Sequence, residues 1–404
     1  MPNADALAVI GAVVHVANGL LEWLMTYAIH STILIGGLLV LTFTTAGRKL
    51  VLGHGSWIWR FALVGAVITS SLQSVRSAAP LAGTLRLDGD TPARTMVRVE
   101  ARKVDNVAAP ERVKTVVKSA IEISPLWPLI ALGTWFAIAG AMVCWFLVAR
   151  ARFLSAIGPR HSANHTLAGN ALRYLQRESR INRQVTLSLS DRLTSPVALS
   201  SDEICLPSRA IAELDPVRME SILAHELAHL VRHDPAWLTI ARLIETIFFF
   251  QPLNILARRR MQEAAEFASD AWASTRVTRP LDLAHCLARV AEWTIAAPRL
   301  PVPAMAERRG AVLVRRVERL TTGRVISENA PGRGVRLAAA VVLVGLILLA
   351  PRAAVGAERP LDRLLGAQRS TDAGILMVRR INDGRVPRPD RGDVQGTFTI
   401  RVQR

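Results

Sequence analysis

Long apolar runs constrain the fold of this chain more than any other feature of its sequence. A helix that crosses a bilayer needs about 20 mostly apolar residues. The runs of this kind are residues 24–43, 57–72, 127–148 and 337–350. Residues 7–21 are also apolar and can lengthen the first run towards the N-terminus. The last run is short, but Arg336 and Arg352 beside it can snorkel to the bilayer surface, so we interpret it as a fourth span.

Basic residues gather at one end of each expected span, namely Arg48, Lys49, Arg60, Arg150, Arg152, Arg333 and Arg336. The positive-inside rule places these ends in the cytoplasm. The loop at 76–124 is also basic, which weakens this orientation without reversing it. The formal net charge of +18 is therefore explained largely by topology, and we expect no direct nucleic-acid partner.

The expected fold class is mainly α, a polytopic helical membrane protein with about four spans. A cytoplasmic α+β domain is expected between spans three and four. The expected segments are spans one and two at 1–75, an extracytoplasmic loop at 76–124, span three at 125–149, the cytoplasmic domain at 150–334, span four at 335–355 and an extracytoplasmic tail at 356–404.

Within the expected domain, residues 184–190 and 196–207 have the composition of short strands. From Asp215 to Thr275 the pattern is helical, and Asp215 followed by Pro216 predicts an N-cap and a first-turn proline. The cysteines, Cys144, Cys205 and Cys286, are scattered and odd in number, which favours reduced thiols over disulfides.

The strongest chemical signal is the pentapeptide from His225 to His229, with Glu226 as its second residue. On a helix, residues four apart share a face, so both imidazoles can reach one Zn²⁺ at about 2 Å. Glu226 is then placed to take a proton from an attacking water rather than to bind the metal. The alternative is a buried helix with satisfied histidines.

A catalytic zinc needs a third protein ligand, and we assign this role to Glu266. Asp270 lies four residues on, where it can accept a hydrogen bond from one zinc histidine. Glu263 is the rival ligand but has no such partner. His233 can bind metal only if its helix bends, so we expect a structural or gating role for it.

These motifs resemble the membrane metallopeptidases of the BlaR/MecR type, the antirepressor family of bacterial signalling proteins. The resemblance runs from about Val185 to Ala273. Its elements are Pro196–Leu199, Ile204–Pro207, Ile222–Asp234, Gln251–Asn254, Glu266–Asp270 and the outlying Arg316–Leu320. Ser269 stands where family members often carry a cysteine.

The resemblance implies a gluzincin in the bacterial cytoplasmic membrane. The α+β domain at 150–334 would then be a zincin-like metallopeptidase domain that faces the cytoplasm. His225, His229 and Glu266 would hold zinc, and Glu226 would act as general base. It also implies signal-dependent cleavage of the chain itself or of a cytoplasmic repressor. Residues 353–404 contain no Ser-x-x-Lys motif, so we expect no penicillin-binding sensor and no covalent sensing of β-lactams by this chain.

Two other functions remain open from the sequence. The same motifs occur in membrane quality-control peptidases related to the CAAX-processing type. A receptor with a purely structural zinc would carry the histidines but would not need Glu226. For a peptidase, we expect an extended substrate to add a strand along residues 196–200. The substrate, signal and oligomeric state do not follow from the sequence.

Overall fold

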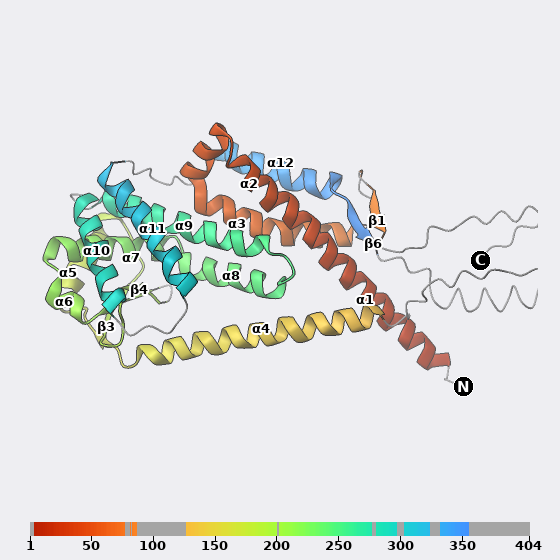
Figure 1. Cartoon of the computed structure of the whole chain (residues 1–404), viewed down its shortest axis with the longest axis horizontal. Coiled ribbons are helices and arrows are strands. Elements are labelled where there is room, and N and C mark those ends of the chain that lie inside the picture. Colours follow the sequence, from red (N-terminus) through yellow and green to blue (C-terminus); the bar gives the residue numbers. More distant parts are fainter. Residues whose placement is uncertain are drawn as a thin grey trace, which may run out of the picture. The chain divides into compact units, whose positions relative to one another are not determined.

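The computed structural model describes residues 4–76, 81, 83–86, 127–199, 202–276, 280–296, 303–323 and 332–354. The expected loop at 76–124 lies largely outside the described residues, and the tail at 356–404 lies wholly outside them. The described part is mainly helical (Figure 1). It forms two compact units, of which one comprises Met1–Glu22, Thr84–Thr134 and Ala353–Arg404, and the other Trp23–Gly83 and Trp135–Arg352. The second unit holds every residue of the expected site.

The first helices are α1 (Ala4–Ser31), the π-helix η1 (Thr32–Gly36), α2 (Gly37–Leu41), α3 (Thr45–Val75) and α4 (Trp127–Ile157). The later helices are α5 (Leu167–Glu178), α6 (Arg209–Glu213), α7 (Pro216–Val231), α8 (Asp234–Ile247), α9 (Leu253–Ser274), α10 (Pro280–Ala296), α11 (Pro303–Thr321) and α12 (Arg333–Leu349). The strands are β1 (Thr84–Arg86), β2 (His161–Ser162), β3 (Thr186–Ser190), β4 (Val197–Ala198), β5 (Glu203–Pro207) and β6 (Arg352–Ala354). In the first unit, β1 pairs with β6.

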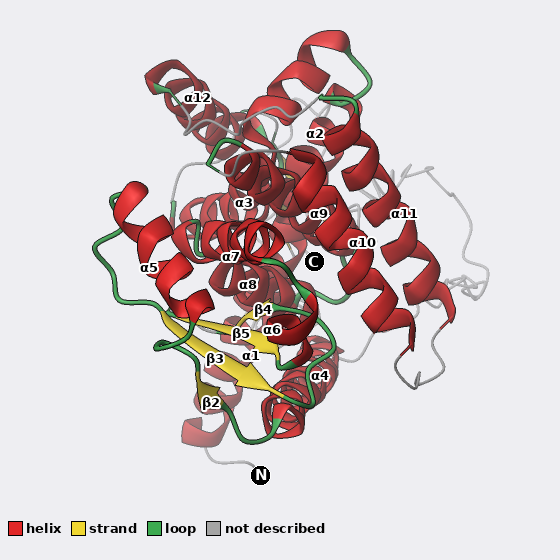
Figure 2. Cartoon of the chain, turned by 90° about the vertical axis from the view of Figure 1, so that its left-hand side faces the viewer, coloured by secondary structure: helices red, strands yellow, loops and turns green. Residues whose placement is uncertain are grey.

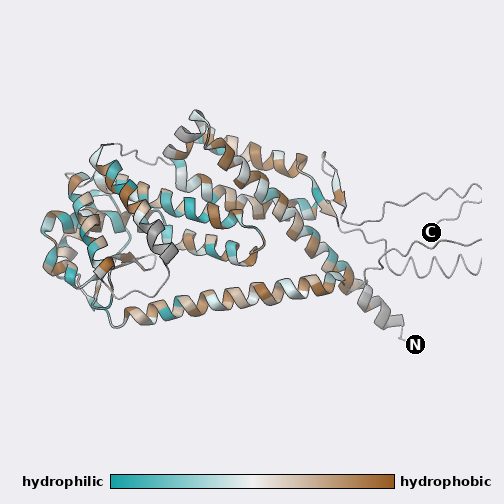
Figure 3. Cartoon of the chain, viewed as in Figure 1, coloured by the Kyte–Doolittle hydropathy of each residue, from teal (hydrophilic) through white to brown (hydrophobic). Residues whose placement is uncertain are grey.

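Three helical stretches of the described residues are long and apolar enough to cross a bilayer. They are Gly11–Leu41, His54–Val75 and Trp127–Ile157, and they coincide with the first three expected spans. The first begins earlier than the run at 24–43, because α1 is one continuous helix. Figure 3 shows the hydrophobic character of α4, whose side chains Phe136 and Trp145 are more than half exposed. Such exposure fits a helix solvated by lipid, and the chain is a membrane protein.

Helix α12, at 17 residues, is not among these three stretches. It packs against α3 and runs parallel to it. The Gln73 side chain donates to the carbonyl oxygens of Ile347 (3.2 Å) and Ala350 (2.9 Å). Gly65, two turns earlier on α3, approaches Leu343. A glycine here lets the two helices come close.

A small mixed sheet supports the helices that carry the expected site. Its strand order is β2-β3-β5-β4, with β3 parallel to β5 and both end strands antiparallel to their neighbours. Strands β3, β4 and β5 lie inside the two stretches predicted to be strands. Figure 2 shows the sheet beside α5, α6 and α7. Its position leaves β4 at the edge nearest α7.

Helix α7 is buried over most of its length. Asp215 caps it by accepting a hydrogen bond from the backbone N–H of Arg218 (2.9 Å), and Pro216 occupies the first turn, as predicted. The first turn of a helix leaves backbone N–H donors unpaired. The Asp215 side chain accepts from one of them, and Pro216 has no N–H to leave unpaired. Leu223 and Leu227 of α7 join Leu187 of β3 and Leu206 of β5 in one hydrophobic core. The helix is therefore held rigidly between the sheet and its neighbouring helices.

Helices α8 and α9 form a hairpin whose tip reaches the apolar helices. Phe248 stacks on Tyr27 of α1, with ring centroids 3.6 Å apart. The Gln251 amide donates to the Ala28 carbonyl oxygen (3.0 Å) and to the Ser31 hydroxyl (2.8 Å). Trp135 of α4 donates to the Ile247 carbonyl oxygen (3.0 Å). These contacts fix the hairpin to two of the helices long enough to cross a bilayer.

Replacing Leu223 with alanine tests how far the core around α7 determines stability. Leu223 is fully buried, so Leu223→Ala leaves a cavity and should lower the free energy of unfolding by about 2–5 kcal/mol. The measurement is thermal unfolding of the detergent-purified protein. Leu167→Ala is the control, because Leu167 is 84% exposed and its removal should leave the midpoint almost unchanged. Equal midpoints for both variants would contradict this description of the core.

Candidate metal centre

Helix α7 presents two imidazoles towards one point. His225 and His229 are one turn apart, and their Nε2 atoms are 3.2 Å from each other. The His225 side chain is 4% exposed and that of His229 is 13% exposed. Two bonds of about 2.0–2.2 Å meeting at a tetrahedral angle separate their donor atoms by about 3.3–3.6 Å. The two nitrogens therefore lie at the separation that a shared metal ion requires.

Helix α9, which packs against α7, supplies the third donor. The Glu266 carboxylate oxygens lie 3.6 Å from Nε2 of His225 and 3.9 Å from Nε2 of His229. Within the described residues, His225, His229 and Glu266 form the group of donors able to hold a metal ion, with all ligand atoms within 4.8 Å of one another. The structure thus brings together the three residues that the sequence analysis proposed as ligands.

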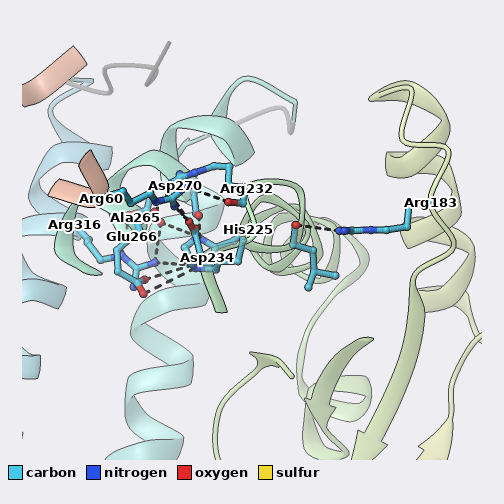
Figure 4. A network of polar contacts seen from close by, with 12 residues as sticks. Arg60, Arg183, His225, Arg232, Asp234, Ala265, Glu266, Asp270 and Arg316 are labelled. Carbon is cyan, nitrogen blue, oxygen red and sulfur yellow. Dashed lines mark hydrogen bonds and ion pairs between the residues drawn. The ribbon is translucent and has the colours of Figure 1, made fainter. Parts of the chain in front are cut away.

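Each histidine turns its other ring nitrogen to a buried aspartate (Figure 4). Nδ1 of His225 lies 3.0 Å from Oδ1 of Asp270, and Nδ1 of His229 lies 2.8 Å from Oδ2 of Asp234. Such a contact fixes the tautomer in which Nε2 is free to bind a metal. The Ser269 hydroxyl also lies 3.2 Å from Nδ1 of His229. Asp270 therefore takes the position predicted for it beside a candidate ligand.

Arg316 of α11 lies against the same group of side chains. Its guanidinium is 2.8 Å from Glu266 and makes two contacts of 2.8 Å with Asp270. It also lies 3.3 Å from Nε2 of His225. Arg315 of α11 forms an ion pair with Glu263 of α9. Arg319 of α11 lies over the Phe267 ring of α9. Helix α11 thus contacts α9 through three arginines, Arg315, Arg316 and Arg319.

The donor cluster combines buried carboxylates with imidazoles and one guanidinium. Burial opposes ionisation of Glu266 and Asp270, but the Arg316 guanidinium outweighs it and lowers the pKa of both carboxyl groups. Burial likewise lowers the pKa of His225, but hydrogen bonds to Asp270 and Glu266 outweigh it and raise that pKa to about 9. The Glu266 and Asp270 carboxylates are therefore favoured in their ionised form although they are buried, with the imidazoles and the Arg316 guanidinium as their counter-charges.

Glu226 is buried beside the cluster without joining it. It is 7% exposed, follows His225 directly on α7, and its charge acts on Arg316. A carboxylate in this position adjoins the donor cluster and is not itself one of the grouped donors. The role proposed for it from the sequence, a proton acceptor next to the metal, stays a prediction.

Other residues considered from the sequence lie elsewhere. Glu263 pairs with Arg315 (2.8 Å) and Arg260 (3.3 Å) rather than with the histidines. His233 has a left-handed backbone, with φ of 56°, and forms the turn between α7 and α8. Its role in the turn agrees with the structural role expected for it.

Three functional contacts were not assigned from the sequence: those of Asp234, Arg60 and Arg316. Asp234 is 1% exposed and follows the αL turn that brings it back to His229. Arg60 lies on α3 and pairs with Asp234. Arg316 comes from α11. The spacing of these residues gives no signal, although Asp234 and Arg316 lie within the motifs that carry the family resemblance.

A protein family and several curated proteins are similar to this chain in sequence. The sequence profile of the family described as BlaR1 peptidase M56 matches residues 23–280. Similar curated proteins are the methicillin resistance mecR1 proteins of Staphylococcus aureus and Staphylococcus epidermidis, each 22% identical over 136 residues. These matches cover 33% of this chain and 23% of each relative. The profile match includes all three donors and ends before Arg316.

Metal content distinguishes the two candidate glutamates of α9. The protein purified in detergent without chelator should hold about one divalent metal ion per chain. Glu266→Ala should lose most of this metal because one of three donors is removed. Glu263→Ala is the matched control, since Glu263 lies on the same helix and pairs only with arginines, and it should keep the metal. Metal loss in the control alone would reverse the assignment. The measurement is elemental analysis by mass spectrometry.

Proposed function

Because the chain belongs to the BlaR1 peptidase M56 family, we propose that it is a membrane-bound, zinc-dependent endopeptidase acting at the cluster of His225, His229 and Glu266. The spacing of these three donors carries the proposal, because it suits a four-coordinate metal that keeps one position open. Two imidazoles with one carboxylate are a donor set typical of zinc peptidases, whereas calcium and magnesium prefer oxygen ligands.

The chain's own residues divide the reaction between them. Zinc, when bound by the three donors, supplies a Lewis acid that polarises the scissile carbonyl and acidifies water. Glu226 accepts the proton of the attacking water and returns it to the leaving amine. Asp270 and Asp234 hold the two imidazoles in the orientation that binding requires. The dry surroundings of α7 strengthen each of these electrostatic interactions.

We propose four spans, with the catalytic domain in the cytoplasm of a bacterial inner membrane. The parallel packing of α3 and α12 supports this, because it puts the N-terminal ends of both helices on one side. Those ends carry the basic residues that the positive-inside rule assigns to the cytoplasm. Arg60 also contacts the turn between α7 and α8, so the start of span two and the catalytic helices lie together.

As substrate we propose either this chain itself or a cytoplasmic regulator such as a transcriptional repressor. The support is the likeness to the methicillin resistance mecR1 proteins, of which the match covers 23%. Such a signalling peptidase would cleave one specific protein in response to one signal, and these two properties would distinguish it from a membrane quality-control peptidase.

The edge strand β4 offers a place for an extended substrate. In its pairing with β5, the Leu199 N–H donates to the Glu203 carbonyl oxygen (3.0 Å), and Val197 and Ala198 lie opposite Cys205 and Ile204. The alternation of an antiparallel pair turns the N–H of Ala198 away from β5. A substrate strand can therefore pair with β4 beside α7.

Ala198→Pro tests binding at this edge. Proline removes the outward N–H of Ala198, so kcat/KM for a peptide substrate should fall roughly 3- to 10-fold, the value of one hydrogen bond. Ala198→Ser keeps the N–H and serves as the control. Metal content should stay at the wild-type level in both variants. Undiminished turnover by Ala198→Pro would remove β4 from the substrate path.

Glu226→Gln tests the catalytic role directly. The change removes the proton acceptor but no donor of the cluster, so cleavage should fall on the order of 10²- to 10⁴-fold while zinc remains bound. Two quantities are measured for the wild type and the variant: the cleavage of the chain itself or of a peptide library, and the zinc content of the purified protein. Glu220→Gln, on the same helix, should retain activity. If Glu226→Gln signals like wild type and neither protein shows cleavage, the protein is instead a receptor with a structural zinc.

A further inference from the structure

Arg60 is a charged residue within one of the most apolar parts of the chain. It lies in the stretch His54–Val75 of α3, which is long and apolar enough to cross a bilayer. Its neighbours Ile58, Trp59 and Leu63 are buried, and its own side chain is 13% exposed. A charge in such a helix is costly and persists where partners compensate it. The identity of those partners therefore indicates what the charge does.

Three contacts join Arg60 to the start of α8 and the turn before it. The guanidinium forms an ion pair with Oδ1 of Asp234 and donates to the Arg232 carbonyl oxygen (3.2 Å). It also lies over the Trp237 ring, 5.3 Å from the centroid. A single side chain of α3 thus holds the α7–α8 turn at three points.

The carboxylate that Arg60 binds is the one that contacts a candidate metal ligand. Oδ1 of Asp234 faces Arg60, whereas Oδ2 faces Nδ1 of His229 at 2.8 Å. Arg232 contributes a second, longer contact of 3.5 Å to Oδ1. Because the two oxygens of one rigid carboxylate are shared in this way, the position of Arg60 determines the direction from which Oδ2 meets His229.

The same arrangement occurs on the other side of the cluster. Asp270 contacts Nδ1 of His225 and is held by two contacts of 2.8 Å from Arg316. Each imidazole therefore contacts an aspartate, which in turn contacts an arginine. One arginine comes from α11, and the other comes from a helix long enough to cross the bilayer (Figure 4).

We propose that Arg60 is a positioning residue of the metal centre, which orients His229 for metal binding through Asp234. The inference rests on the proposed role of His229 as a zinc ligand. Groups that contact metal ligands directly, as Asp234 contacts His229, change metal affinity by about 10- to 100-fold when they are removed, and Arg60 acts through this contact. The second span thereby sets the affinity of an active centre from which it supplies no ligand.

The test measures zinc affinity of the full chain in detergent, by competition with a chelator of known affinity. Arg60→Met should weaken zinc binding about 10-fold or more. Arg60→Lys keeps the charge and should restore most of the affinity. Arg242→Met is the matched control, because Arg242 also pairs with a carboxylate of α8, Glu245, which is not one of the grouped donors. Its zinc affinity should equal that of wild type.

A double-mutant cycle separates positioning from general loss of structure. If Arg60 acts through Asp234, adding Arg60→Met to Asp234→Asn should change zinc affinity less than about twofold. If the two substitutions instead weaken zinc binding independently, so that their fold-changes multiply in the double variant, the proposal is overturned. The visible absorption of the Co²⁺-substituted protein reports ligand geometry and should shift in Arg60→Met and not in Arg242→Met.

Each remaining outcome is decisive. Should Arg60→Met fail to fold, Arg60→Gln takes its place and must weaken zinc binding at least about fivefold. Wild-type affinity in a folded neutral variant overturns the role of Arg60 while leaving the peptidase proposal intact. Absence of zinc binding by the wild-type chain overturns the proposed function instead, so the two failures are distinguishable.

Discussion

Ionised carboxylates buried against imidazoles are the constraint on which this structure depends. Asp234 and Asp270 are almost fully buried, and removing a carboxylate from water costs several kcal/mol unless charge and hydrogen bonds compensate it. Each has a histidine on one side and an arginine on the other. Because α7 and α9 do not supply the compensating arginines Arg60 and Arg316, α3 and α11 must pack against the site. The need to compensate buried charge therefore determines which helices surround the cluster.

The surrounding architecture keeps this arrangement rigid. The sheet and the core leucines hold α7 from one side, and the α8–α9 hairpin is fixed at its tip by Gln251 and by the stacking of Phe248 on Tyr27. The hairpin carries Asp234 at one end and Glu266 with Asp270 on its second helix. Packing in the apolar helices and geometry at the cluster are thus linked through the same two helices.

Local spacing was enough to predict the parts of the site that lie within one helix. His225 and His229 share a face because they are four residues apart, and Asp270 follows Glu266 by the same interval. The N-cap at Asp215 and the short strands followed from residue type. Asp234, Arg60 and Arg316 could not be assigned in this way, because their partners lie across an αL turn or on separate helices. Span four also stays a prediction, since α12 has 17 residues and its length does not decide the matter.

The position of Arg60 bears on how such a protein can be divided. An excised piece that begins after α4 would contain every candidate donor and the whole sheet, and by its motifs it would look self-sufficient. It would nevertheless leave Asp234 in the interior without its ion pair with Arg60, and with only the longer contact from Arg232 among the arginines described for it. The smallest independent unit therefore reaches forward to α11, which carries the outlying motif Arg316–Leu320, and back across the membrane region to α3, past the N-terminal end that the motifs suggest. The boundaries of a fragment that folds by itself are therefore determined by which charged residues pair, and not by the order of the segments along the chain.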